Sequence, residues 1–479
     1  MMRVVIVHYH LRPGGVTRVI AHAATELMVH GASVVVLASG DLPQDFPCPV
    51  RQVPALAYDE GGAAVSPDQL QRQMDMAVRD ALGGEADLWH IHNHSLGKNL
   101  ALPVTVANMA RAGRRILLQI HDFPEDFRSY NYRRLRDFIP LDQFAETLYP
   151  QAPQVQYCVL NGRDRRFLAK AGVAEERLHT LANPVWMPQA ATEDIPNWPY
   201  RLWLYPTRAI RRKNIGEWLL WSALAGPEDR FATSLAPENP REQQRYRQWV
   251  GLAKALNLPV SFDLATQTQL SFATLLRSAY CLGTTSVAEG FGMAFLEPWL
   301  LDRPVAGRNL PEITQDFDAL GVALSHLYTR LPIPLDFFEV GEIASRLRRA
   351  LTQLYGDYRL PPPGEAELQR AWDAWVQEDQ VDFGCLDEDL QAKVIRHLCH
   401  HPHSRNALSM TQLTVAANEV ISHNRRVIQE NYSLSAYGER LMAIYQGLLA
   451  ASPGPVSGLD CDTLLRCFLQ PERLNLLRL

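Results

Sequence analysis

Short apolar runs alternate with amphipathic stretches along the first third of the chain. The runs have the length of β-strands and lie at residues 3–7, 33–38, 87–92, 116–120 and 156–160. Between the first two, Val19, Ile20, Ala23 and Leu27 recur at helical spacing, and Gly31 then supplies a stop signal. This alternation predicts β-α-β units that build a parallel, doubly wound sheet.

A second series of the same kind begins after a change of composition near residue 190. Residues 186–199 are rich in Pro, Asn and Trp and lack periodicity, which indicates an interdomain linker. The elements expected after it are strands at 203–205, 260–262 and 280–283, and helices at 215–225, 270–278 and from Gly292 onward. We therefore predict a first Rossmann-like domain at residues 1–190 and a second at residues 200–430.

Long, charged helical stretches characterise the later part of the chain. They run from about residue 331 to 424, with Pro361-Pro362-Pro363-Gly364 as an interruption, and exceed what a second Rossmann-like domain requires. We interpret them as a helical insertion in that domain. A cleaner helix follows at 435–449, and the tail at 451–479 is left without an assigned role.

Composition narrows the class of protein. The 479 residues are 47% hydrophobic and 21% charged, which is typical of a folded chain long enough for two cores. A net charge of −5 gives no basic face for nucleic acid, and no apolar stretch reaches the ~18 residues that cross a bilayer, so a cytoplasmic protein is expected. Seven scattered cysteines without a C-x-x-C pair disfavour a disulfide framework and a cysteine-zinc site.

A glycine-rich segment at residues 286–297 is the strongest functional signal. It joins an expected strand to an expected helix, so its backbone N–H groups can bind an anion such as a diphosphate. Glu289 and Glu297 lie eight positions apart and can hold different parts of an extended ligand. A carboxylate that accepts two neighbouring hydroxyls is a common way to hold a sugar or a ribose. The residues between these two carboxylates include Gly290, Phe291, Gly292 and Met293.

This segment, with Pro304 and Val305 downstream, resembles the E-x7-E signature of retaining glycosyltransferases with the GT-B fold, in particular the large family 4 (glycosyl transferases group 1). The resemblance implies two facing Rossmann-like domains and retaining transfer of a hexose from a nucleotide-diphosphate sugar without a metal or other cofactor. It also implies that Glu297 binds the donor ribose, and that Glu289 with the backbone of 291–293 binds the sugar. The chain departs from the family pattern at Pro298, Trp299, Leu301 and Asp302.

A second segment, residues 205–215, brings two cations to the same edge of the second sheet. Arg208 and Lys213 follow an expected strand and precede an expected helix. A departing nucleotide diphosphate gains negative charge, which fixed cations stabilise. In the resembled family a strand-Arg-x4-Lys-helix segment binds the donor diphosphate, so Arg208 and Lys213 are the expected catalytic cations. The alternative is that Arg211, Arg212 and Lys213 form a solvated basic patch.

The N-terminal half is expected to hold the acceptor. Gly14 and Gly15 open a helix and resemble the family's loop that approaches the donor phosphates, and Asn183 lies in a segment similar to one near the family's hinge. His121 matches a position beside the reacting sugar carbon, where an uncharged imidazole can hydrogen-bond a hydroxyl or shield an oxocarbenium ion. A segment at 432–445 resembles the family's closing helix, which implies a return of residues 431–450 to the first domain. The expected acceptor-binding residues are His92, His94, Asp122, Tyr130 and Arg133.

The sequence is compatible with several alternatives. The histidines at 90, 92 and 94 are either structural, lining an acceptor cleft, or metal ligands, and the cluster at 397–403 is interpreted as surface polar sequence rather than a zinc site. The basic, aromatic segment 128–136 fits an anionic acceptor, the inner face of an anionic membrane, or a solvated helix face. For the whole chain, the alternatives are a non-catalytic regulator that binds nucleotide sugars, and another GT-B enzyme such as a phosphorylase or an epimerase.

Overall fold

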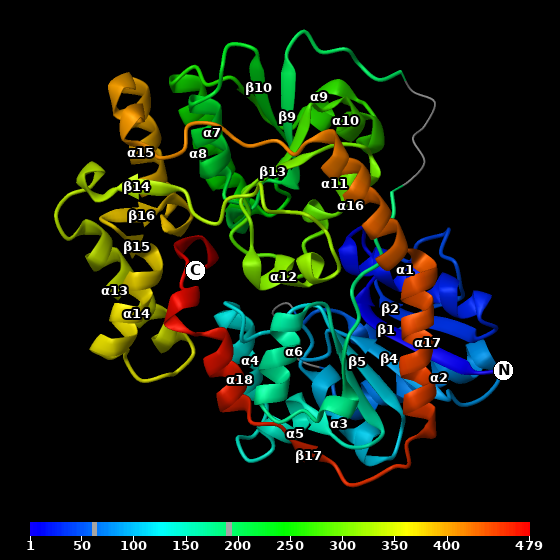
Figure 1. The fold of residues 1–479 in the computed structure, drawn as a ribbon. Coiled ribbons are helices and arrows are strands. Elements are labelled where there is room, and N and C mark those ends of the chain that lie inside the picture. Colours follow the sequence, from blue (N-terminus) through cyan, green and yellow to red (C-terminus); the bar gives the residue numbers. More distant parts are fainter. Residues whose placement is uncertain (60–64, 188–193) are drawn as a thin grey trace. The chain divides into compact units, whose positions relative to one another are not determined.

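The chain forms two compact units in the computed structural model, which describes residues 1–59, 65–187 and 194–479 (Figure 1). The first unit comprises residues 1–184, 357–360 and 432–469, and the second comprises residues 185–356, 361–431 and 470–479. The first division of the chain therefore falls at residues 184/185, where the sequence predicts a boundary near 190. Part of the predicted linker at 186–199 lies outside the described residues.

Parallel strands form the central sheet of the first unit, in the order β3-β2-β1-β4-β5-β7-β8. Their bounds are β1 (Arg3–His10), β2 (Ser33–Ser39), β3 (Val50–Gln52), β4 (Leu88–His92), β5 (Ile116–Ile120), β7 (Val155–Val159) and β8 (Leu178–Thr180). The apolar runs predict all of these except the short edge strands β3 and β8. Every residue of β4, β5 and β7 is buried, as expected for parallel strands that are covered on both faces.

Helices pack on both faces of this sheet because alternate residues of each strand point to opposite sides. Val4 and Ile6 of β1, for example, join the core cluster beneath α1, which buries its stripe of Val19, Ile20 and Leu27 there. The helices of the unit are α1 (Gly15–Val29), α2 (Pro67–Leu82), α3 (Ala101–Arg111), α4 (Ser129–Phe138), α5 (Phe144–Leu148), α6 (Gly162–Lys170), α17 (Leu434–Ala450) and α18 (Cys461–Phe468). A short antiparallel pair, β6 (Pro150–Gln151) and β17 (Ser457–Gly458), attaches the C-terminal segment to the same unit.

The helix α17 belongs to the first unit despite its position late in the chain, and it lies beside α1 in Figure 1. Tyr437, Leu441 and Tyr445 enter the same core cluster as α1. The two helices approach closely at Gly438, where a Cβ atom would lie 2.9 Å from the Cβ of Glu26. This helix occupies the place in the sequence where the family resemblance implies a closing helix.

Parallel strands also form the main sheet of the second unit, in the order β11-β10-β9-β12-β13. Their bounds are β9 (Arg201–Arg208), β10 (Asp229–Leu235), β11 (Val260–Ser261), β12 (Cys281–Thr284) and β13 (Val305–Gly307). The helices that accompany them are α7 (Ile215–Ala223), α8 (Pro240–Ala255), α9 (Leu264–Thr268), α10 (Phe272–Ser278), α11 (Glu297–Leu300) and α12 (Pro311–Ala319). β9 and β12 are neighbours, so their carboxyl ends meet at one edge of the sheet.

The helix expected from Gly292 onward is interrupted in the structure, which corrects that prediction. Residues Met293–Phe295 form a single 3-10 turn, η4, and the four-residue helix α11 then begins at Glu297. Pro298 accounts for the break, because proline lacks the N–H of a continuous helix and is tolerated in the first helical turn.

The segment after β13 is largely helical, as predicted, but it also contains a small sheet that the sequence does not predict. Its helices are α13 (Glu342–Asp357), α14 (Glu365–Trp375), α15 (Glu388–His400) and α16 (Asn418–Asn431). The antiparallel strands β14 (Pro332–Pro334), β16 (Gln380–Asp382) and β15 (Val376–Gln377) pair in that order. Residues 357–360, within the predicted insertion, cluster with the first unit.

A buried ion-pair network ties this insertion to the sheet of the second unit. The guanidinium of Arg308, just after β13, donates to both carboxylate oxygens of Glu217 in α7 and of Asp382 in β16, at 2.7–3.2 Å. Tyr328 also donates to Glu217, at 2.7 Å. The two carboxylates replace water as hydrogen-bond acceptors of the Arg308 guanidinium. The insertion is therefore joined to the core of the second unit through a fully hydrogen-bonded network.

No helix among the described residues is long and apolar enough to cross a membrane.

Candidate functional site

Two loops at the carboxyl edge of the second sheet are hydrogen-bonded to each other. After β9 comes the 3-10 turn η3 (Arg211–Lys213), closed by Asn214 in the left-handed region at φ 53°. After β12, Thr285 Oγ1 donates to the carbonyl oxygens of Lys213 and Asn214, at 3.1 and 3.0 Å. The N–H of Val287 donates to the carbonyl of Arg212, at 3.0 Å. These bonds bring the side chain of Lys213 next to the glycine-rich loop.

Lys213 and Glu289 form an ion pair at this junction. Ser286 Oγ donates to the same oxygen of Glu289, at 2.6 Å, and Tyr205 OH lies 2.9 Å from Ser286 Oγ. The Lys213 and Glu289 side chains are only 15% and 10% exposed. The sequence expects both residues to lie at the carboxyl edge of this sheet, and the structure places them in contact there.

The charges of this pair are set by burial and by each other. Burial alone raises the pKa of Glu289, but the charge of Lys213 and the hydrogen bonds from Lys213 and Ser286 outweigh it and hold that pKa below its usual range. Burial lowers the pKa of Lys213, and the carboxylate of Glu289 opposes that shift. The site therefore holds an ionised carboxylate that a positive neighbour stabilises.

Arg208 lies at the exposed end of β9 and does not contact the Lys213–Glu289 pair. Its guanidinium forms an ion pair with Glu238, and the two side chains are 46% and 80% exposed. An ion pair this exposed contributes about 0–1 kcal/mol, so an anionic ligand can displace it at little cost.

The glycine-rich loop combines a backbone that only glycine adopts easily with side chains that enter the core. Gly292 has φ 94°, and a Cβ on it would lie 2.9 Å from the ring of Phe295. Phe291 is buried and packs edge-on against Phe317, at 5.5 Å between ring centroids. Glu297 begins α11 and is half-buried. The loop residues Gly290 and Met293 are also half-buried.

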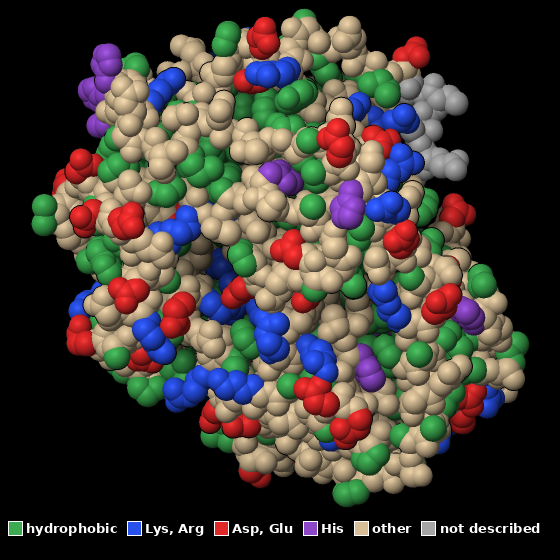
Figure 2. Space-filling model, in the orientation of Figure 1, with side chains coloured by type: hydrophobic (Ala, Val, Ile, Leu, Met, Phe, Trp, Pro, Cys, Tyr) green, Lys and Arg blue, Asp and Glu red, His purple; other side chains and the backbone are tan. Residues whose placement is uncertain are grey.

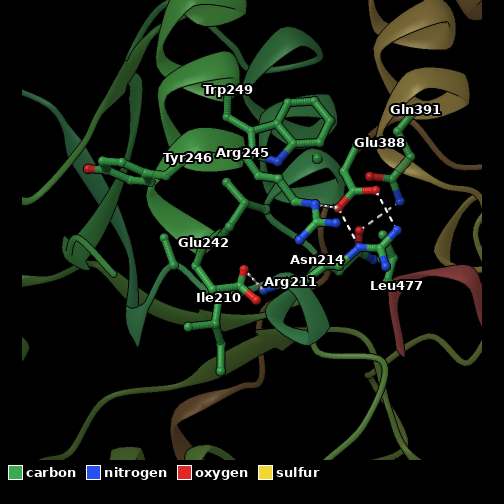
Figure 3. A pocket seen from close by; sticks show the side chains of 13 residues that line it. Ile210, Arg211, Asn214, Glu242, Arg245, Tyr246, Trp249, Glu388, Gln391 and Leu477 are labelled. Atoms are coloured by element: carbon green, nitrogen blue, oxygen red, sulfur yellow. Dashed lines mark hydrogen bonds and ion pairs between the residues drawn. The ribbon is translucent and has the colours of Figure 1, made fainter. Parts of the chain in front are cut away.

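The residues that hold the η3 turn come from distant parts of the chain, and sequence reasoning missed them. Arg211 Nε and Nη2 donate to the two carboxylate oxygens of Glu388 in α15, at 2.6 and 2.9 Å. Gln391, one turn further along α15, donates to Asn214 Oδ1 at 2.8 Å, and Glu242 of α8 accepts the Arg211 N–H at 2.9 Å. Figure 3 shows Arg211 pointing at Glu388 and Asn214 facing Gln391. No local spacing signals these partners, because Glu388 lies 177 positions from Arg211.

The pocket between these residues is too small to be a substrate site. It has about 10 Å³ of free volume, which is room for about one water molecule. It lies where the η3 turn contacts the insertion. In the predicted basic patch, Arg211 is already bound to the carboxylates of Glu388 and Glu242.

Buried histidines line the carboxyl edge of the first sheet. His92 Nδ1 lies 2.8 Å from His121 Nε2, and His90 pairs with Tyr445 OH and Gln119 Oε1, each at 2.8 Å. Burial lowers the pKa of His121 to about 3 and that of His90 to about 4, so both imidazoles are uncharged at neutral pH. The role expected for His121 beside the reacting sugar carbon requires this uncharged form. Among the described residues, no group of three His, Cys, Asp or Glu side chains is placed to hold a metal ion.

The predicted acceptor residues have different surroundings in the structure. His94 is fully buried and bonds to the carbonyl of Leu148 at 2.8 Å, whereas Tyr130 is 66% exposed. Asp122 forms an ion pair with Arg128, and Arg133 forms one with Asp357. His92 and His121 are thus in contact, and Asp122 follows His121 and shares its acceptor Asn93 Oδ1.

Residues 129–136 of the basic segment lie in α4, which Arg128 immediately precedes. The arginines of the segment have partners, and that of Arg136 is the ring of Phe144, at 4.7 Å from its centroid. Besides those two ion pairs, Arg134 donates to the carbonyls of Gly97 and Asp59. In the view of Figure 2, basic side chains gather over α4 and α6, interspersed with acidic ones. The segment reads as a paired helix surface of the first unit.

The remaining predicted donor residues also lie in the first unit. Gly14 and Gly15 are exposed at the start of α1, where the cap makes no side-chain hydrogen bond and the first turn carries no acidic residue. Asn183 is buried, and its Oδ1 has no hydrogen-bond partner among the described residues.

Comparison with known proteins identifies the fold. No protein-family model matches the chain. The chain is 24% identical over 433 residues, 82% of its own length and 81% of the relative's, to the mannosylglucosyl-3-phosphoglycerate synthase of Petrotoga mobilis. It is therefore similar to one curated enzyme along most of both chains.

Solved structures match at lower identity. The sucrose-phosphate synthase from Thermosynechococcus elongatus superposes with a TM-score of 0.55 at 13% identity, covering 94% of this chain and 100% of that one. HepE from Anabaena, solved with UDP and glucose, gives a TM-score of 0.53 at 14% identity, covering 93% and 100%. A glycosyltransferase from Rickettsia africae gives 0.53 at 12% identity, covering 94% and 99%. These likenesses confirm the predicted α/β fold of the GT-B class.

Proposed function

We propose that the protein is a retaining, metal-independent glycosyltransferase that moves a hexose from a nucleotide-diphosphate sugar to an anionic acceptor. The observation that carries this proposal is the buried Lys213–Glu289 pair at the carboxyl edge of a Rossmann-like sheet. The similarity to a curated synthase over most of both chains, and a GT-B neighbour solved with UDP and glucose, support a glycosyltransferase with a nucleotide-sugar donor.

The pair explains how one site can hold two unlike parts of the donor. Lys213 turns from Glu289 to the diphosphate, and Glu289 then accepts hydroxyls of the transferred sugar. Arg208 leaves its exposed partner Glu238 for the same diphosphate, and Glu297 holds the ribose. The diphosphate thus replaces a carboxylate as the partner of a buried cation, so the desolvation of Lys213 is already present before the donor binds.

The reaction that we propose exchanges one glycosidic bond for another on the same face of the sugar. The bond between the anomeric carbon and the diphosphate oxygen breaks, and its electron pair stays on the leaving phosphate. The acceptor oxygen forms the new bond to that carbon, and its proton passes to the phosphate oxygen. Lys213 and Arg208 stabilise the charge that develops on the leaving group, which is a term that can be worth several kcal/mol. By its resemblance to the family position beside the reacting carbon, we assign to the neutral imidazole of His121 the shielding of the carbon that becomes cationic.

The acceptor that we propose is a small molecule with a phosphate or carboxylate group. The curated relative is named for a product that contains 3-phosphoglycerate, which carries both groups. A net charge of −5 for the whole chain makes local cations necessary for such an acceptor.

The substitution Lys213→Ala tests the role of the pair. We expect turnover to fall at least a hundredfold, as for the loss of one preorganised charge-stabilising donor. A thermal-shift screen of nucleotide sugars first identifies the donor, and product formation is then followed by mass spectrometry. Lys254→Ala, at the exposed end of α8 in the same unit, is the matched control and should retain full activity. Near-normal turnover in Lys213→Ala would remove the residue from the mechanism, and donor binding without any turnover in the unmodified protein would indicate a regulator instead.

A further inference from the structure

A cavity of about 280 Å³ lies at the carboxyl edge of the first sheet, outside the predicted acceptor residues. His10 and Arg12 line it from the end of β1 and the loop that follows, residues 39–41 line it from the end of β2, and Ala57 and Tyr58 close it. Its volume approaches the lower end of the range for small-ligand pockets, ~300 Å³. The cavity belongs to the first unit alone.

Hydrogen bonds hold the walls of this cavity in place. Asn99 donates to the carbonyls of Ala55 and Ala57, each at 2.8 Å, which fixes the segment that carries Tyr58. Tyr58 OH lies 3.0 Å from His10 Nε2, and Ser39 Oγ donates to the carbonyl of Tyr9 at 2.5 Å. The cavity is therefore preformed, so a ligand would not have to order it.

The charged groups at the cavity have no ion-pair partner among residues 1–59, 65–187 and 194–479. Arg12 is a cation in the lining, and Lys98 lies over the ring of Tyr58 at 5.3 Å. Asp41 provides a carboxylate just after the neighbouring parallel strand β2. Arg133 and Arg134 of α4 are engaged in ion pairs, whereas Arg12 and Asp41 offer their charges to a ligand in the cavity.

The chemistry of the lining selects a particular kind of ligand. A guanidinium binds a phosphate or carboxylate, a carboxylate accepts hydrogen bonds from hydroxyls, and an aromatic ring packs against the C–H face of a polyol. Arg12, Asp41 and Tyr58 supply one group of each kind. A polyol that carries one anionic group matches all three.

The cavity shares its sheet edge with His121. His8 Nδ1 donates to the carbonyl of His10 at 2.7 Å, and the rings of His8 and His92 lie edge to face with centroids 6.3 Å apart. His92 in turn contacts His121 at 2.8 Å. A row of imidazoles across β1, β4 and the end of β5 thus connects the cavity with the residue that we place beside the reacting carbon.

We propose that this cavity is the acceptor subsite, and that it binds the anionic polyol part of the acceptor with Arg12 on the phosphate or carboxylate and Asp41 on the hydroxyls. The inference rests on the proposed function and makes it more specific. It places acceptor recognition at Arg12, Asp41 and Tyr58, rather than at the predicted Tyr130 and Arg133.

Saturation-transfer difference NMR with 3-phosphoglycerate on the full chain tests this subsite without any need for turnover. We expect signal from the unmodified protein and from Arg72→Ala, which removes an exposed arginine of α2 with no ion pair among the described residues. Arg12→Ala should weaken 3-phosphoglycerate binding at least fivefold. Since Arg12 is exposed, its removal should leave the thermal transition unchanged, which circular dichroism checks. No binding by the unmodified protein, or equal binding by Arg12→Ala, would overturn the proposal.

A kinetic experiment separates the failure of this inference from failure of the proposed function. With the donor identified, Arg12→Ala and Tyr58→Ala should raise the acceptor KM at least fivefold while donor hydrolysis in the absence of acceptor stays at the unmodified rate. Unchanged acceptor KM in both variants of an active enzyme contradicts the subsite alone. If the unmodified protein consumes no nucleotide sugar, the proposed function itself is wrong, and with it the assignment of this cavity to an acceptor.

Discussion

The contact between Glu388 and Arg211 offers a test of whether the insertion positions the turn that we propose binds the diphosphate. Glu388→Gln removes one charge from a bidentate pair whose side chains are 18% and 17% exposed. Arg245 approaches the same carboxylate at 3.3 Å, so two arginines lose a partner. Hydrogen bonds to charged groups contribute ~1.5–3 kcal/mol, and the amide of glutamine keeps part of that. We expect the free energy of unfolding to fall by about 1–3 kcal/mol.

The catalytic effect follows from the position of these contacts on either side of Lys213. Glu388 holds Arg211, and Gln391 holds Asn214, so α15 fixes the turn before and after the lysine. If the displacement of Lys213 raises the activation free energy by about 1.4 kcal/mol, turnover falls roughly tenfold. Affinity for the nucleoside diphosphate should fall with it, whereas affinity for the nucleoside should not change.

Isothermal titration with the nucleoside diphosphate of the identified donor and with its nucleoside measures this difference directly. Glu365→Gln is the matched control, because it removes a carboxylate from an exposed pair with Arg348 in the same insertion. Gln391→Ala should act in the same direction as Glu388→Gln. If Glu388→Gln lowers the thermal transition but leaves both affinities and turnover unchanged, α15 stabilises the unit without positioning Lys213.

Two further predictions concern the first unit. Burial raises the pKa of Glu125 to about 7, so the neutral form of this carboxyl is favoured in the folded state. The stability that Glu125 contributes therefore declines as pH rises from its pKa in the unfolded chain toward its pKa in the folded chain. Glu125→Gln should flatten the dependence of the melting temperature on pH between about 5 and 7.5, and an unaltered dependence would contradict the assignment. Gly438→Ala should lower stability by about 1–3 kcal/mol because the added Cβ would lie 2.9 Å from the Cβ of Glu26. Gly447→Ala on the same helix meets its nearest atom at 3.9 Å and should be neutral or slightly stabilising, and equal melting temperatures of the two variants would refute the packing argument.

Sequence pattern predicts the strands that are continuous apolar runs and misses those that are not. β5 is predicted with its observed bounds because every residue from Ile116 to Ile120 is buried. β10 is missed because it begins with Asp229 and Arg230 and contains Thr233, whose burial depends on neighbouring strands. The helix expected after Gly292 fails at Pro298, where a local rule outweighs the periodicity on either side.

The candidate site is predictable only where the sheet topology brings residues together. β9 and β12 are neighbours, so the two segments that the sequence singles out for Lys213 and Glu289 meet at one edge. Arg12 and Tyr58 lie on different connections and carry no shared motif, and their common cavity is visible only in the folded chain. Side-chain pairing of this kind depends on tertiary contacts that no local spacing encodes.

The two predicted donor cations differ in what a ligand must displace. Arg208 and Glu238 form an exposed pair whose rupture costs about 0–1 kcal/mol, so an anionic ligand can displace Glu238 from Arg208 at little cost. Lys213 is buried against Glu289, and separating the two without replacement would leave an uncompensated buried charge at a cost of about 3–5 kcal/mol. Only a ligand that offers an anion to Lys213 and hydroxyls to Glu289 at the same time avoids that cost. Under the proposed function, the pair therefore favours a complete nucleotide sugar over free phosphate or free sugar.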